Sequence, residues 1–162
     1  MGYFLAALAM AAACVLEAAW PTPLFWAGER PEILVAAVMS TALAFGGRFG
    51  LVAGFFAALF RGALEQQPWG GLFVAYMFVG FASGLVGHRL LVRRALAAAP
   101  AALAAVLAFR LVLMLFQPPE AFGLWLRGSF HAIVYTMMVA VPLHALALLL
   151  QGGRYGPGTF WR

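Results

Sequence analysis

Four charged residues lie within segments that are otherwise strongly apolar, and they are the residues of this chain best placed to do chemistry. They are Glu17, Arg61, Arg110 and Arg127. A charge inside a lipid bilayer costs several kcal/mol unless it finds a partner or water. Glu17 is the one acid among them, so we expect an intramembrane charge pair between Glu17 and either Arg110 or Arg61. The alternative is that the arginine side chains extend to the membrane surface.

The sequence contains no pattern typical of an enzyme or a metal site. It lacks a P-loop, an HExxH motif and a nucleophile elbow. His88, His131 and His144 do not have the spacing of metal ligands. The single cysteine, Cys14, cannot form an intramolecular disulfide. We therefore predict a protein that is not an enzyme, with no catalytic residues, no cofactor and no bound metal.

The composition indicates what surrounds these charges. Hydrophobic residues make up 65% of the 162 residues, charged residues make up 9%, and the mean hydropathy is +0.97. A soluble domain usually has about 25% charged residues. At roughly 20 residues per membrane span, the chain has room for about six spans. We expect an all-α polytopic membrane protein, with a six-helix transmembrane domain over 1–150 and a short polar tail over 151–162.

The six expected helices are bounded by prolines, glycines and polar residues. They cover approximately residues 3–25, 33–46, 50–65, 71–88, 97–117 and 124–150. Pro21 and Pro23 close the first helix, and a tight glycine-rich connection over 46–50 joins the second helix to the third.

The arginines predict the orientation. With six spans both termini lie on one side, and six arginines then gather there without any acid: Arg48, Arg89, Arg93, Arg94, Arg154 and Arg162. The positive-inside rule places that side, and both termini, in the cytoplasm. The net charge of +5 thus points to membrane lipid and not to nucleic acid.

Small residues recur every four positions along the third expected helix, and two more lie on the fourth. They are Gly46, Gly50, Gly54, Ala58, Gly62, Gly80 and Gly84. Small residues let helix backbones approach closely in a membrane, so we predict that this stripe packs one helix of the protein against another. The alanine-rich faces of the first and fifth helices leave two alternatives open. They pack inside the protein, or they contact an external helix. That helix can belong to another protein or to a second copy of this chain in a homo-oligomer.

Several short motifs resemble those of the rod shape-determining MreD family. They are Arg30-Pro31-Glu32 before the second helix, Gly47-Arg48 in the hairpin, Gly54-Phe55, the turn Pro68-Trp69-Gly70, and Tyr135, Thr136 and Pro142 in the last helix. The similarity covers mainly residues 30–94, with a weaker echo over 124–150. The chain departs from the family at Arg61, where MreD proteins often have Asp.

The resemblance implies a non-catalytic scaffold of the elongasome, which builds lateral-wall peptidoglycan and maintains rod cell shape. The implied partners are MreC and, in the wider assembly, MreB, RodA and a class B penicillin-binding protein. The family's fold resembles the substrate-binding components of energy-coupling-factor transporters. This likeness gives the alternative function, a transporter component that binds a vitamin or a metal in a cavity lined by Glu17, Trp20, Tyr76 and Arg110.

Overall fold

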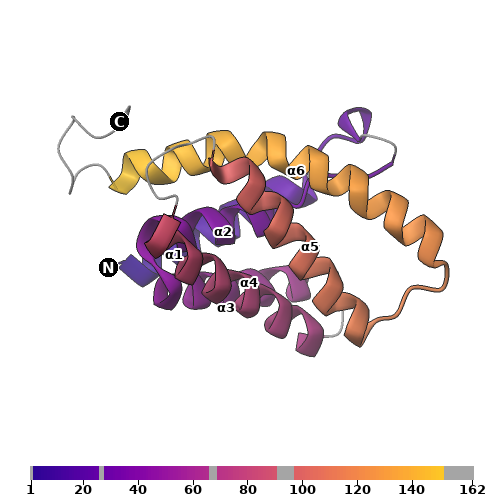
Figure 1. The fold of residues 1–162 in the computed structure, drawn as a ribbon, viewed down its shortest axis with the longest axis horizontal. Coiled ribbons are helices and arrows are strands. Elements are labelled where there is room, and N and C mark those ends of the chain that lie inside the picture. The colour runs from indigo at the N-terminus through magenta and orange to yellow at the C-terminus, as the bar shows by residue number, and fades with distance from the viewer. Residues whose placement is uncertain (1, 26–27, 66–68, 91–96, 152–162) are drawn as a thin grey trace.

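The computed structural model describes residues 2–25, 28–65, 69–90 and 97–151, and these residues form an all-α protein (Figure 1). The elements are α1 (Gly2–Ala18), a 3-10 helix η1 (Thr22–Leu24), α2 (Ile33–Phe45), α3 (Gly47–Glu65), α4 (Trp69–Leu90), α5 (Ala98–Phe116) and α6 (Phe122–Gln151). By length and composition, α3, α4, α5 and α6 are long and apolar enough to cross a membrane, and α1 and α2 are apolar but shorter. The expectation of a helical membrane protein is confirmed at this level.

The first helix is shorter than we predicted. It was expected to continue to Phe25, but α1 ends at Ala18 and a separate turn of 3-10 helix follows. Pro21 explains the difference, because a residue that precedes proline is disfavoured in the helical conformation. The other five helices begin and end within one turn of their predicted bounds. The expected polar tail, including Arg154 and Arg162, lies outside the described residues apart from Gln151, which ends α6.

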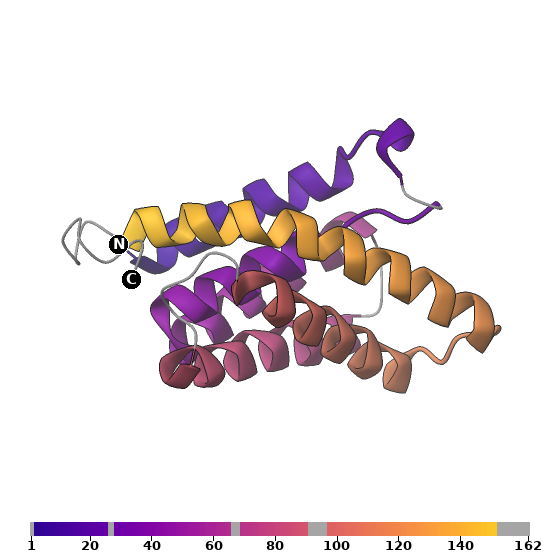
Figure 2. The same ribbon diagram turned by 45° about the horizontal axis from the view of Figure 1, so that its top comes forward.

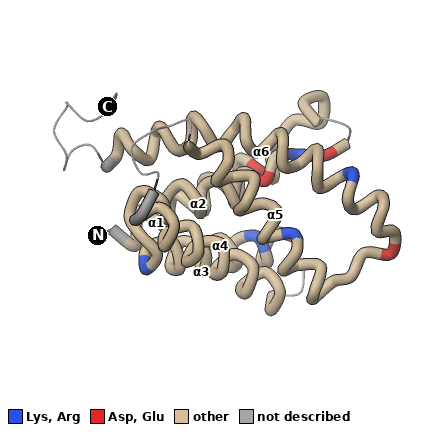
Figure 3. Tube along the Cα trace, in the orientation of Figure 1, with Lys and Arg blue, Asp and Glu red and all other residues tan. Residues whose placement is uncertain are grey.

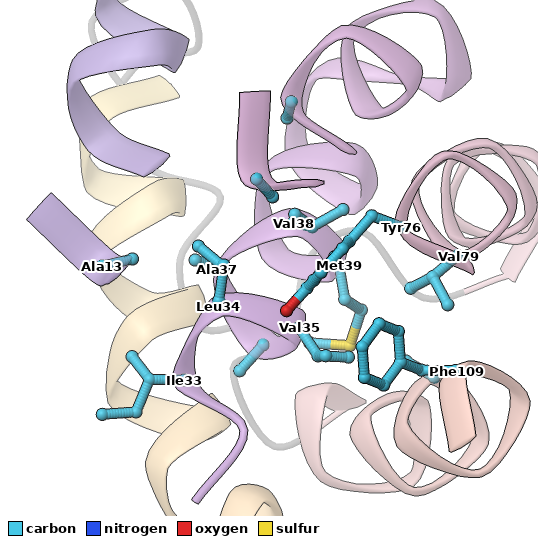
Figure 4. Close-up of a cluster of buried hydrophobic side chains, with 14 of the residues drawn as sticks. Ala13, Ile33, Leu34, Val35, Ala37, Val38, Met39, Tyr76, Val79 and Phe109 are labelled. Atoms are coloured by element: carbon cyan, nitrogen blue, oxygen red, sulfur yellow. The ribbon is translucent and has the colours of Figure 1, made fainter. Parts of the chain in front are cut away.

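Helix α2 lies at the centre of the protein. All of its residues except Thr41 and Phe45 are buried, and it packs against each of the other five α-helices. Figure 4 shows Val35 and Met39 of this helix beside Tyr76 and Phe109. A helix that is apolar on every side is typical of a position inside a bundle.

Helix α2 is also short for a membrane-spanning helix. Its 13 residues extend about 20 Å, against a hydrocarbon core of about 30 Å. The residue that precedes it, Glu32, is buried. The helix therefore begins inside the protein, where its first N–H groups have no access to water.

The small-residue stripe packs α3 against α4. A Cβ atom added to Gly50 would overlap the carbonyl oxygen of Gly80, one added to Gly54 would overlap that of Tyr76, and one added to Gly84 would overlap the backbone of Gly47. Ala58 and Gly62 are buried on the same helix. The two backbones therefore lie in direct contact along most of the stripe, as expected where small residues line a helix interface.

Gly46 lies at the edge of this interface and takes part in it only through its backbone, because a Cβ atom added to Gly84 would also overlap the carbonyl carbon of Gly46. It terminates α2 with a φ of 93°, and a Cβ atom added to Gly46 itself would meet nothing within 4 Å. The positive φ of the turn, and not close packing, therefore accounts for glycine at this position. Gly46 was predicted as a packing residue because the four-residue repeat of small residues continues past the end of the helix.

The helices alternate in direction along the chain (Figures 1 and 2). The beginning of α1 and the end of α6 lie at the same end of the molecule, together with the connection between α2 and α3. The last turns of α1, α3 and α5 and the first turns of α2, α4 and α6 point toward the other end. All acidic residues visible in Figure 3 lie in the half of the molecule toward that other end.

The contact between α3 and α4 predicts opposite effects for two glycine-to-alanine substitutions. Gly54→Ala should lower the free energy of unfolding in detergent by about 1–3 kcal/mol, because the added methyl group must separate the backbones. Gly70→Ala, in the first turn of α4, meets open space and should leave stability unchanged or slightly raised, because alanine favours a helix. Equal thermal unfolding temperatures for the two variants would contradict the close contact.

Candidate functional site: a buried charge network

Every ion pair in the described part of the chain belongs to one continuous cluster, which we call the charge network. Its members are Glu17, Glu29, Arg30, Glu32, Arg61, Glu65 and Arg110. They come from α1, the segment between η1 and α2, α3 and α5. The network therefore joins four parts of the fold around the buried beginning of α2.

Arg61 lies at the centre of the charge network. Its Nη1 atom donates hydrogen bonds to Glu32 Oε2 and to the hydroxyl of Tyr76, each over 2.7 Å, and its Nε atom donates to Glu65 Oε2 over 2.9 Å. The guanidinium carbon lies 5.6 Å from the centre of the Phe109 ring, a cation–π distance. This buried arginine thus has strong partners and does not extend to the membrane surface.

Arg110 reaches the same network from α5. Its Nη2 atom lies 3.1 Å from Glu32 Oε1 and 3.4 Å from Glu29 Oε2, and its Nη1 atom lies 3.3 Å from the hydroxyl of Ser129 on α6. Each oxygen of Glu32 thus accepts from a different arginine, so this carboxylate bridges α3 and α5.

Two arginines stabilise the ionised form of Glu32. Arg61 and Arg110 each place a positive charge and a hydrogen-bond donor against its carboxylate, which offsets the cost of burying that charge. The backbone N–H of Glu32 also donates to the hydroxyl of Thr136 over 2.9 Å, and that hydroxyl donates to the carbonyl of Ala132 over 2.6 Å. Glu32 is therefore held by α3, α5 and α6 together.

Of the two arginines predicted as partners of Glu17, the structure supplies Arg61. Glu17 Oε1 lies 3.3 Å from Arg61 Nη1, and Glu17 Oε2 accepts a hydrogen bond of 2.7 Å from the backbone N–H of Leu34. The alternative pairing with Arg110 was wrong, because within the described residues α1 packs against α2 and α3 and makes no contact with α5.

Four members of the charge network were not predicted to take part, namely Glu29, Arg30, Glu32 and Glu65. Glu32 is only 6% exposed, and Glu65 pairs with both Arg30 and Arg61. Glu65 follows Arg61 by four residues on one helix, and this spacing in the sequence indicates an ion pair between them. No sequence pattern indicated that Glu32 lies inside the protein, since this depends on how deeply α2 begins.

The residues of the family-like motifs lie near the network or in helix turns. Arg30 pairs with Glu65, and Pro31 is buried beside Glu32. Gly70 lies in the first turn of α4 and Pro142 inside α6, whereas Pro68 is outside the described residues.

The remaining candidate residues lie outside the charge network. Arg127 is exposed and makes no ion pair within the described residues, and its backbone carbonyl accepts from His131 Nδ1 over 2.8 Å. His144 is fully buried. The described residues contain no group of three potential metal ligands.

A cavity of about 270 Å³ lies between α1, α2 and α6, away from the charges, and is lined mainly by alanine and leucine. Ala9, Ala13, Ala37 and Leu146 are among its walls. Ser40 and Thr41 are the polar residues among those that line it. Such a lining offers few hydrogen bonds to a polar ligand.

Comparisons with protein-family models, with curated proteins and with solved structures found no match to this chain.

The bridge through Glu32 predicts coupling between Glu32 and Arg110. Glu32→Gln and Arg110→Gln should each lower the free energy of unfolding by about 3–5 kcal/mol, because each removes one of the charged partners of a buried ion. The double variant should cost clearly less than the sum of the single costs. Unfolding in detergent measures all three variants. Additive costs would contradict the bridge, and Glu120→Gln, in an exposed connection, is the control that should not change stability.

Proposed function

We propose that this protein is a non-catalytic, multi-pass scaffold of the bacterial inner membrane that acts as MreD proteins do. In this proposal six helices cross the membrane in a bundle like that of the substrate-binding components of energy-coupling-factor transporters. The scaffold binds MreC and supports lateral-wall peptidoglycan synthesis and rod shape, together with MreB, RodA and a class B penicillin-binding protein.

The observation that carries the proposal is the position of Glu32. Glu32 ends the Arg30-Pro31-Glu32 motif on which the resemblance mainly rests, and it accepts hydrogen bonds from arginines on two different helices. Thr136, which belongs to the weaker similarity in α6, accepts a hydrogen bond from the backbone N–H of Glu32. The motif residues therefore stabilise the packing of the helices, which favours a structural protein over a catalyst.

The same geometry favours a scaffold over a transporter component. Two of the residues expected to line a ligand cavity, Glu17 and Arg110, are occupied by partners within the protein. The indole of Trp20 donates to the hydroxyl of Tyr135 over 3.3 Å, which in turn donates to the carbonyl of Leu24 over 2.7 Å. A ligand at this position would have to displace these interactions.

The partner is expected to meet an apolar face. On α1 the buried side carries Ala6, Met10 and Ala13, so part of its alanine-rich face packs internally. On α5 the alanines Ala98, Ala102 and Ala105 are likewise buried. What these two helices offer to a membrane partner is therefore their exposed leucines, such as Leu8 and Leu107.

Affinity purification of the chain from its native membrane tests the proposal, with MreC as the expected co-purifying protein. Leu8→Trp on α1 and Leu107→Trp on α5 alter exposed positions and should preserve folding. One of them should reduce recovery of MreC severalfold, whereas Leu124→Trp on α6, also exposed, serves as the matched control. Recovery of a transport ATPase in place of MreC would support the transporter alternative and overturn the scaffold.

The proposed orientation has a separate test by cysteine labelling in intact cells. Gly2→Cys and Gly158→Cys should be protected from a membrane-impermeant reagent, because both termini are proposed to be cytoplasmic. Glu120→Cys should react, because it lies at the opposite end. The native Cys14 is buried and should contribute little background. Labelling of either terminus from outside would contradict the proposed orientation.

A further inference from the structure

The charges of the network do not balance. Its ion pairs join four carboxyl groups, of Glu17, Glu29, Glu32 and Glu65, to three guanidinium groups, of Arg30, Arg61 and Arg110. If every acid were ionised, the network would carry one uncompensated negative charge at a largely buried site. Buried acids without a full counter-charge take up a proton and become neutral.

The hydrogen bonds identify Glu17 as the acid that accepts none from an arginine. Arg61 Nη1 carries two hydrogens, and both are used within 2.7 Å, by Glu32 and by Tyr76. Glu17 Oε1 lies farther away, 3.3 Å from the same nitrogen, and no hydrogen remains there for it. Its contact with Arg61 is thus an electrostatic one without a hydrogen bond.

The other three carboxyl groups are better placed to remain ionised. Glu32 and Glu65 each pair with two arginines. Glu29 pairs with one arginine, but 34% of its side chain is exposed, so water can stabilise its charge. Glu17 is only 3% exposed. The excess charge is therefore most costly at Glu17.

We propose that Glu17 carries a proton in the folded protein, so that the charge network is a neutral unit with a bound proton. The proton resides on Oε1, while Oε2 continues to accept the hydrogen bond from the N–H of Leu34. In this state Glu17 supplies an uncharged acceptor to the buried beginning of α2. The inference concerns the charge state of the network and does not depend on the proposed partner.

The surroundings of Glu17 on every side are consistent with a neutral acid. The titratable and charged groups that act on it are Cys14 on its own helix, Arg30 and Glu32 before α2, Arg61 on α3 and Tyr76 on α4. Glu65 on α3 shares Arg61 with it. Cys14 and Tyr76 are uncharged at neutral pH. The two arginines are both shared with Glu65, and Arg61 also with Glu32.

Infrared spectroscopy of the purified protein in nanodiscs tests the proposal directly. The chain has five glutamates and no aspartate, so side-chain carboxylic acids can come only from glutamate. At pH 7 the wild-type protein should show the carbonyl band of a protonated carboxylic acid, moved by carbon-13 labelling of glutamate. Glu17→Gln should remove this band, and Glu120→Gln should leave it. A wild-type protein without the band, or a band that survives in Glu17→Gln, would overturn the proposal.

Stability measurements separate a neutral acceptor from a counter-ion. Glu17→Gln retains an oxygen for the N–H of Leu34 and should unfold at nearly the wild-type temperature, well above Glu32→Gln. Glu17→Leu removes the acceptor and should unfold at a clearly lower temperature. If Glu17→Gln lost as much stability as Glu32→Gln, Glu17 would be an ionised partner of Arg61 and the proposal would be wrong. If the glutamine variant did not fold, a wild-type spectrum without the band would still overturn the proposal.

Discussion

The beginning of α2 inside the protein is the constraint on which the rest of the structure depends. A helix that starts away from water must have its first N–H groups satisfied by the protein itself. Glu17 accepts from Leu34, and Thr136 accepts from Glu32, so α1 and α6 must lie on either side of this end. Because Glu32 is buried together with the helix end, its charge requires arginines at the same depth, and α3 and α5 supply them.

The close contact of α3 with α4 serves the same cluster. At Gly54 the backbone of α3 meets the backbone of Tyr76, and the hydroxyl of Tyr76 accepts a hydrogen bond from Arg61, seven residues further along α3. The ring of Tyr76 lies 4.6 Å from that of Phe109 on α5. A small-residue stripe and a charged cluster, which look unrelated in the sequence, thus depend on each other, since a wider separation of the two helices would withdraw one partner of Arg61.

Periodicity and composition predicted the helices and the all-α class, because apolar segments bounded by Gly and Pro specify local structure. They predicted that Gly50, Gly54, Gly80 and Gly84 lie in a close helix contact, since small residues have few other uses at that spacing. They did not predict that Glu32 is buried, because this depends on the length of α2 relative to its neighbours. The pairing of Glu17 likewise required knowing which helices adjoin α1.

Nearly all charged residues at membrane depth are paired with one another inside the helical bundle. This pairing limits how the protein can recognise a partner in the membrane. Arg61, Glu17 and Glu32 already have partners, and the exposed surfaces of α1 and α5 are rich in leucine, valine and phenylalanine. Lipid chains cover such surfaces as well as protein does, so apolar exposure gives no preference for one partner helix. Selectivity must then come from shape along those faces, or from the end of the molecule where Glu29, Arg30 and Glu65 are partly exposed. The charge network can contribute to this selectivity only at that end, because only there does it reach the surface.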